Sequence, residues 1–277
     1  MTLELAFESV GDGPPLLILH GLFGSGGNWR SVARALSTSH RVISVDLRNH
    51  GGSPWVETMS YLQMADDVRA LIEWERLRLP AVMGHSMGGK TAMALALLYP
   101  ELLSRLIVVD IAPVCYADRL SMTTEAMRAI DTVAAASRDE VQQRLGELLP
   151  DASAVPFLMQ NLVARNDRFD WRVNLASISS EARTLSGFPA ELRGLRFAKP
   201  MHVIAGQQSD YVADRHGAEF QPMFPEVQVE VIEQAGHWVH ADQRGRFLDA
   251  AARALRTHPA SPLYGAAAAA RQLRRSS

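Results

Sequence analysis

The sequence lacks the features that would tie it to a membrane or to an oxidising compartment. Only one of its 277 residues is a cysteine, Cys115, so no internal disulfide can form. This favours a location in a reducing compartment. No apolar run approaches the roughly 18 residues of a membrane span, and residues 1–15 lack the basic and apolar regions of a signal peptide. We therefore expect a soluble, cytoplasmic protein without a membrane partner.

An excess of charge of one sign is also absent. The chain has 28 Lys and Arg against 30 Asp and Glu, which gives no electrostatic case for binding nucleic acid. Its hydrophobic content of 47% can fill a large interior, and we find no internal repeat. The length of the chain suits one large α/β domain, and the balanced charge indicates a neutral or small substrate. We expect a monomer or homodimer, a choice that the sequence leaves open.

Short apolar runs alternate with helical patterns along most of the chain. The run at 16–19 is apolar on both faces, which is typical of buried parallel strands, and residues 3–9 suggest an edge hairpin leading into it. The order of strands and helices predicts a doubly wound, mostly parallel sheet. We expect further strands near 41–46, 81–83, 103–110, 201–205 and 227–233, and helices near 28–37, 61–75, 90–99, 214–223 and 243–257.

The alternation stops at Pro113, and residues 121–194 show helical periods only. A helical insert between two strands of such a sheet is best interpreted as a cap over the carboxyl edge, where substrates bind. The predicted organisation is a first part of the core at 1–112, a helical cap at 113–198, a second part of the core at 199–257, and a C-terminal tail at 258–277 without a catalytic role.

The stretch from Pro80 to Met93 carries the first chemical motif. Gly84-His-Ser-Met-Gly88 joins an apolar run to a helical pattern and matches G-x-S-x-G, the nucleophile elbow. A Cβ at either glycine would crowd the tight turn, and the free N–H groups of the following helix would stabilise negative charge near Ser86. Ser86 is therefore the candidate nucleophile.

The same letters permit a second interpretation. Residues 84–91 also match G-x-x-x-x-G-K-T, a phosphate-binding loop, with 106–110 as its magnesium-binding strand. In that case Lys90 would contact phosphate and Thr91 would hold magnesium. The apolar pattern starts the helix at Met87 or Gly88, however, which leaves too short a loop to wrap a phosphate.

A serine nucleophile needs a base, and His237 is the best candidate among nine histidines. It follows the last predicted strand, in Ala-Gly-His-Trp, and the order of nucleophile first and histidine last fits an α/β-hydrolase. His85 should point away from the site, and His50 is expected to brace a turn. A metal at His237-x-x-His240-x-Asp242 lacks further ligands at suitable spacing.

Together these segments resemble the YbfF-type esterases of the α/β-hydrolase superfamily over about residues 16–256. The resemblance implies a fold of about eight mostly parallel strands with a helical cap, no metal and no organic cofactor. It also implies an oxyanion hole made of the N–H groups of Leu22 or Phe23 and of Met87. The motifs that carry it are His20-Gly-Leu-Phe-Gly-Ser25, Val45-Asp-Leu-Arg-Asn-His-Gly51, Gly84-His-Ser-Met-Gly-Gly-Lys90, Val109-Asp-Ile-Ala-Pro113, Trp171-Arg-Val-Asn174 and Ala235-Gly-His-Trp-Val-His240.

The acid of the triad departs from the common superfamily pattern. Most members place an aspartate three residues after the glycine that ends the seventh strand, but here that position holds Ser209, and Asp210 follows one residue later. The YbfF type resembles a rarer layout with the acid at the end of strand six, which corresponds to Asp110. We expect Asp110 to be the acid and keep Asp210 as the alternative.

The resemblance implies a serine hydrolase that cleaves short- to medium-chain acyl esters or acyl-CoA-type thioesters through an acyl-enzyme on Ser86. Hydrolysis of carbon–carbon bonds and cofactor-free perhydrolysis on the same fold stay open, as does a non-enzymatic ligand receptor that keeps the serine and histidine. Cap aromatics are usually core residues, but some could line an acyl pocket. The candidate substrate-binding residues are His20, Phe157, Trp171, Phe188 and Trp238.

Overall fold

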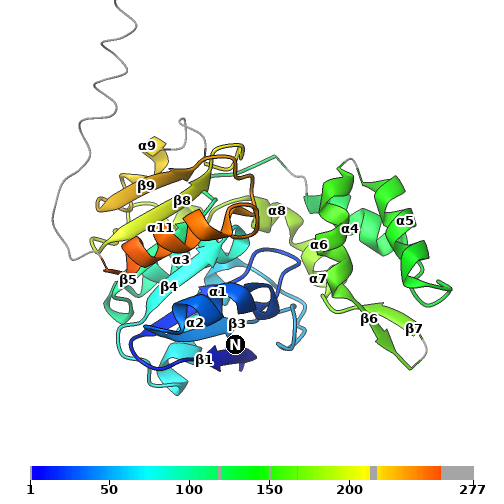
Figure 1. Cartoon of the computed structure of the whole chain (residues 1–277), viewed down its shortest axis with the longest axis horizontal. Coiled ribbons are helices and arrows are strands. Elements are labelled where there is room, and N and C mark those ends of the chain that lie inside the picture. Colours follow the sequence, from blue (N-terminus) through cyan, green and yellow to red (C-terminus); the bar gives the residue numbers. More distant parts are fainter. Residues whose placement is uncertain (1, 118–119, 150, 167, 213–216, 257–277) are drawn as a thin grey trace, which may run out of the picture.

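The computed structural model describes residues 2–117, 120–149, 151–166, 168–212 and 217–256, and these contain one seven-stranded sheet (Figure 1). The strands run in the order β1-β3-β2-β4-β5-β8-β9, and all neighbours are parallel except β1, which is antiparallel to β3. This confirms the predicted mostly parallel α/β fold. The strands are β1 (Phe7–Val10), β2 (Pro15–Leu19), β3 (Arg41–Val45), β4 (Ala81–His85), β5 (Arg105–Val109), β8 (Met201–Gly206) and β9 (Val227–Ile232).

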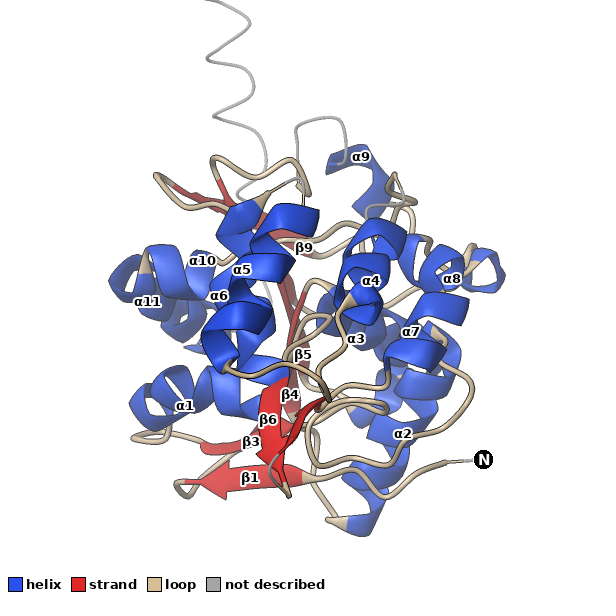
Figure 2. Ribbon diagram, turned by 90° about the vertical axis from the view of Figure 1, so that its right-hand side faces the viewer, coloured by secondary structure: helices blue, strands red, loops and turns tan. Residues whose placement is uncertain are grey.

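Helices cover both faces of the sheet because its central strands are apolar on both sides. The helices α2 (Tyr61–Trp74) and α3 (Met87–Leu98) lie on one face, and α1 (Arg30–Leu36) and α11 (Arg244–Arg256) on the other (Figure 2). The side chains of residues 16–19 are fully buried between these layers. Shorter core helices are the 3₁₀ turns Gly26–Trp29 and Pro100–Leu102, α9 (Gly217–Phe220) and α10 (Val239–Asp242).

The expected edge hairpin was wrong, and the main sheet of the described residues has seven strands where about eight were expected. The strand β1 pairs with β3 and not with the strand that follows it. The preceding segment turns toward α2, because the Leu3 amide donates to Asp67 Oδ1 at 2.9 Å instead of joining a ladder. A sequence pattern shows that a segment is extended but not which strand accepts its hydrogen bonds.

The segment between β5 and β8 forms a second layer beside the core, shown in green in Figure 1. The prediction of helical structure only was wrong here, because β6 (Leu162–Arg165) pairs antiparallel with β7 (Arg168–Trp171). Strands of four residues are too short for an alternating period to stand out. The helices are α4 (Leu120–Ala129), α5 (Arg138–Leu148), α6 (Val155–Leu158), α7 (Leu175–Ser180) and α8 (Ala182–Ser186), with 3₁₀ turns at Ala152–Ala154, Met159–Asn161 and Ala190–Leu192.

Within the described residues, no helix combines the length and the apolar character that crossing a bilayer requires. The predicted C-terminal tail, 258–277, lies outside the described residues. The boundaries of the cap at 113 and 198 stay a prediction, and we use the word cap for that range.

Lys90 joins two distant segments of the cap range to the core. It lies on α3, is 1% exposed, and its ammonium donates to the carbonyl oxygens of Val114 at 2.8 Å, Ser186 at 3.1 Å and Gly187. The rings of Tyr116 and Tyr61 lie 4.7 and 5.6 Å from the same nitrogen, which adds cation–π attraction. The three donors of the ammonium are therefore used within the protein, and the phosphate-loop interpretation was wrong.

The substitution Lys90→Met should lower the free energy of unfolding by about 1–3 kcal/mol, because it leaves buried carbonyl oxygens without donors at nearly unchanged volume. Urea denaturation of both proteins measures this difference. Lys199→Met is the matched control, since Lys199 is more exposed and donates to one carbonyl oxygen, that of Leu103 at 2.7 Å. Equal losses in the two variants would contradict a special role for Lys90.

Candidate active site

Ser86 lies at the sharp turn between β4 and α3. Its backbone has φ 52° and ψ −118°, a strained conformation for a residue with a side chain. The turn can be this tight because a Cβ on Gly84 would lie 2.1 Å from the Gly88 oxygen, and one on Gly88 would lie 2.4 Å from the Leu19 oxygen. Both glycines of the motif are therefore required by close backbone contact, and the strain is stored at the candidate nucleophile.

The structure brings His237 and Asp110 together at the same edge of the sheet. Asp110 directly follows β5, and His237 lies in the loop after β9, so both stand at carboxyl ends of parallel strands. The Nδ1 atom of His237 lies 2.7 Å from Asp110 Oδ2. Such a bond fixes the imidazole with its proton on Nδ1 and leaves Nε2 free to act as a base.

The carboxylate of Asp110 is fully buried but well supplied with donors. Its Oδ1 accepts from the Gly206 amide at 2.9 Å, and its Oδ2 accepts from the Ser209 hydroxyl as well as from His237. A buried charge is stable only when it is paired and hydrogen-bonded, and this one is. Ser209 occupies the position where most members of the superfamily have the acid, and here its hydroxyl donates to Asp110, the candidate acid.

The alternative acid, Asp210, lies on the wall of the cavity that contains Ser86. Among the described residues, His237 donates to the carboxylate of Asp110 and makes no hydrogen bond to Asp210. The shift of one residue relative to Ser209 explains the difference, because neighbouring side chains in a turn point in different directions. The geometry therefore favours Asp110.

Ser86 and His237 share the wall of a cavity of about 420 Å³. The His237 ring stacks on Tyr211, with centroids 4.1 Å apart and planes 26° apart, and its side chain is 19% exposed. Among the described residues neither Ser86 Oγ nor His237 Nε2 has a hydrogen-bond partner. The structure thus places nucleophile and base at one cavity, and the proton transfer between them belongs to the proposal below.

Of the two alternatives for the first oxyanion donor, the structure favours Leu22 over Phe23. The Phe23 amide donates to His50 Nε2 at 3.2 Å, so it points into the core and the Phe23 alternative was wrong. The amides of Leu22 and Met87 have no backbone or side-chain acceptor among the described residues. Both residues also border Ser86 in a smaller cavity.

Two buried histidines shape the loop that carries Leu22. His20 is fully buried, with Nδ1 donating to the Gly21 oxygen and Nε2 accepting from the Leu47 amide, and it lines neither cavity beside Ser86, so substrate binding by His20 stays a prediction. His50 likewise braces the loop, since Nδ1 donates to the Arg48 oxygen while Nε2 holds Phe23. Burial lowers the pKa of His20 to about 4 and the pKa of His50 to about 3, so both are neutral at pH 7.

The other predicted substrate-binding residues divide into two groups. Phe157 and Trp238 line the larger cavity, with ring centroids 5.6 Å apart. Trp171 is 5% exposed and donates from Nε1 to the Met127 oxygen at 3.1 Å, and Phe188 packs on the main hydrophobic core. Trp171 and Phe188 line neither of the two cavities that Ser86 borders, so a substrate role for them stays a prediction.

The side chains of the metal alternative point to different partners. His240 stacks on Trp29 at 4.1 Å, and Asp242 Oδ2 accepts from the Gly236 amide at 2.8 Å. The described ranges contain no cluster of three or more His, Cys, Asp or Glu side chains arranged to hold a metal ion.

Residues 14–243 match the family model of the alpha/beta hydrolase fold, and the chain belongs to this family. It is similar to mouse sn-1-specific diacylglycerol lipase ABHD11, with 37% identity over 245 residues that cover 86% of this chain and 79% of that protein. Esterase YbfF of Escherichia coli is 33% identical over 248 residues, covering 88% and 92% of the two chains. The resemblance to YbfF-type esterases is confirmed.

Solved structures agree with the fold. A marine microorganism esterase superposes with a TM-score of 0.86 at 34% identity, covering 91% of this chain and 99% of that one.

Acid should destabilise this protein through its buried neutral histidines. Between pH 6.5 and about 4, the unfolded chain takes up protons that folded His20 and His50 do not, so stability falls as the pH drops. His50→Gln keeps an acceptor for the Phe23 amide. In this variant the free energy of unfolding should fall less steeply with decreasing pH than in wild type, by up to about 1.4 kcal/mol per pH unit. Urea titrations at pH 7, 6 and 5 measure both slopes, and parallel slopes would contradict the assignment.

Proposed function

We propose that this chain hydrolyses carboxylic esters or thioesters with short- to medium-chain acyl groups, acyl-CoA thioesters included, through an acyl-enzyme on Ser86. The observation that carries the proposal is the bond between His237 Nδ1 and Asp110 on a cavity wall that also contains Ser86. The similarity to proteins named as esterases and lipases supports the same reaction class.

In the proposed acylation step, His237 Nε2 takes the proton of Ser86 Oγ as that oxygen attacks the carbonyl carbon. The oxyanion accepts hydrogen bonds from the amides of Leu22 and Met87, the second of which begins α3, where the helix dipole favours negative charge. Collapse breaks the bond to the leaving oxygen or sulfur, which takes the proton from His237. Water then repeats the cycle and releases the acid and free Ser86.

Asp110 acts on the imidazole and not on the substrate. Its buried carboxylate accepts from Nδ1 and stabilises the imidazolium that forms in each step. Ser209 and Gly206 hold that carboxylate in place. The proposed role of Asp110 is therefore to orient His237 and to stabilise its protonated form.

We also propose that the enzyme works in the cytoplasm as a monomer or homodimer, without a nucleic-acid or membrane partner. The near balance of charge and the single cysteine support this proposal.

The substitution Ser86→Ala should lower kcat/KM for the best substrate by roughly 10⁴-fold or more, because the acyl-enzyme cannot form. A panel of p-nitrophenyl esters and acyl-CoA thioesters, run on wild type and variant, measures the loss. Thermal unfolding of the variant serves as the control for folding. Full activity of Ser86→Ala would overturn the proposal.

The substitution Asp110→Asn should lower kcat by roughly 10³- to 10⁴-fold, because an amide at this position favours the wrong imidazole tautomer. Asp210→Asn is the matched control and should change kcat little, although it alters the cavity wall. Steady-state hydrolysis of one p-nitrophenyl ester compares them. The reverse pattern would assign the acid to Asp210.

A further inference from the structure

Ser86 stands between two cavities of different size. The larger, of about 420 Å³, is lined by His237 and Trp238, whereas the smaller, of about 50 Å³, is lined by Tyr61 and Met87. Ser86 belongs to both walls, as do Leu22, Leu120 and Tyr211. An ester bound at Ser86 therefore has two different spaces for its two halves.

Proton transfer decides which half enters which space. The leaving group must receive its proton from His237 Nε2, so it has to lie on the His237 side, in the larger cavity. The oxyanion donors Leu22 and Met87 both line the smaller cavity. With the oxyanion at these amides and the leaving group in the larger cavity, the smaller cavity is the space left for the acyl chain.

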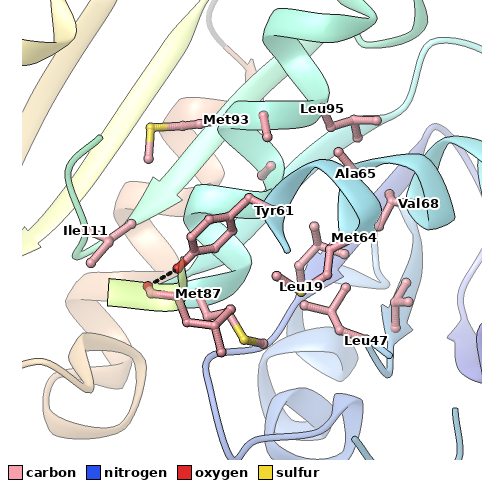
Figure 3. Close-up of a cluster of buried hydrophobic side chains, with 14 of the residues drawn as sticks. Leu19, Leu47, Tyr61, Met64, Ala65, Val68, Met87, Met93, Leu95 and Ile111 are labelled. Carbon is pink, nitrogen blue, oxygen red and sulfur yellow. Dashed lines mark hydrogen bonds between the residues drawn. The ribbon is translucent and has the colours of Figure 1, made fainter. Parts of the chain in front are cut away.

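Part of the wall of the smaller cavity consists of buried core residues. Tyr61 is 2% exposed, and its hydroxyl donates to the Leu185 oxygen at 2.6 Å, so the hydrogen bond of its polar end is made within the protein. Figure 3 shows Tyr61 beside Met87 and Ile111, within the buried cluster that borders this space. These positions lie in the main hydrophobic core, so little room can be gained without disturbing it.

Lys90 also lines the smaller cavity but offers it no free charge. All three N–H donors of its ammonium are taken up by the carbonyl oxygens of Val114, Ser186 and Gly187. The cavity therefore presents aliphatic and aromatic carbon to the acyl chain, and the point where the cap joins α3 lies on its wall.

We propose that this smaller cavity is the acyl pocket and that it limits the acyl group to two to four carbons, while the larger cavity accepts a bulky alcohol or thiol. A cavity of about 150 Å³ holds one benzene molecule of six carbons, so 50 Å³ holds about two carbons beyond the carbonyl. The larger cavity has room for an aromatic or similarly large group, and the contacting rings of Phe157 and Trp238 form part of its wall. This inference rests on the proposed ester hydrolysis at Ser86 and specifies its substrates.

The test is a series of p-nitrophenyl esters from acetate to octanoate, assayed with wild type, Leu185→Ala and Leu158→Ala. Leu185 lines only the smaller cavity and Leu158 only the larger one. Wild type should lose at least tenfold in kcat/KM between butyrate and octanoate. Leu185→Ala should move the optimum to six or more carbons, whereas Leu158→Ala should keep the wild-type dependence on acyl length.

A wild-type optimum at octanoate would overturn the inference, and that result needs no variant that might fail to fold. A change of acyl preference in Leu158→Ala but not in folded Leu185→Ala would also overturn it. Absence of Ser86-dependent hydrolysis for every ester would instead refute the proposed function. The two failures are therefore distinct.

Discussion

The close contact of β2, β4 and the start of α3 is the constraint on which the site depends. Two glycines let the α3 backbone approach both strands to distances that no Cβ permits, and the turn between them holds Ser86 at a positive φ. Because β2, β4 and β5 are neighbours and parallel, their carboxyl ends place the loop that carries Leu22, Ser86 and Asp110 side by side. The candidate site is thus a consequence of strand order.

The cap is tied to the same loops and not only to the surface of the core. Asn161 donates to the Phe23 oxygen at 2.7 Å, and so reaches the oxyanion loop from the cap side. Asn49, which follows β3, donates to Ser177 and accepts from Asn174 at about 3.0 Å in each case. Together with the bonds of Lys90 to Val114, Ser186 and Gly187, these polar contacts tie residues 114–187 to the loops around Ser86.

The elements that carry the chemistry were predictable because they follow from local patterns. The doubly apolar run 16–19 predicted a central strand, and the glycine spacing around Ser86 predicted the turn, since each depends on residues close in sequence. The contacts of Phe23 and Trp171 were not predictable in this way. The Phe23 amide depends on His50 and the Trp171 ring on the Met127 oxygen, and both partners are more than 20 residues away.

The sequence by itself determined the class of fold, the nucleophile turn and the position of a histidine after the last strand, because backbone sterics and apolar periods act over a few residues. Only the tertiary structure decided which carboxylate meets His237, since Asp110 and Asp210 lie 100 residues apart and differ by where their strands end in space. It also decided that Lys90 serves the cap and that Ser86 borders two unequal cavities. Packing between distant segments, which no local pattern encodes, sets each of these features.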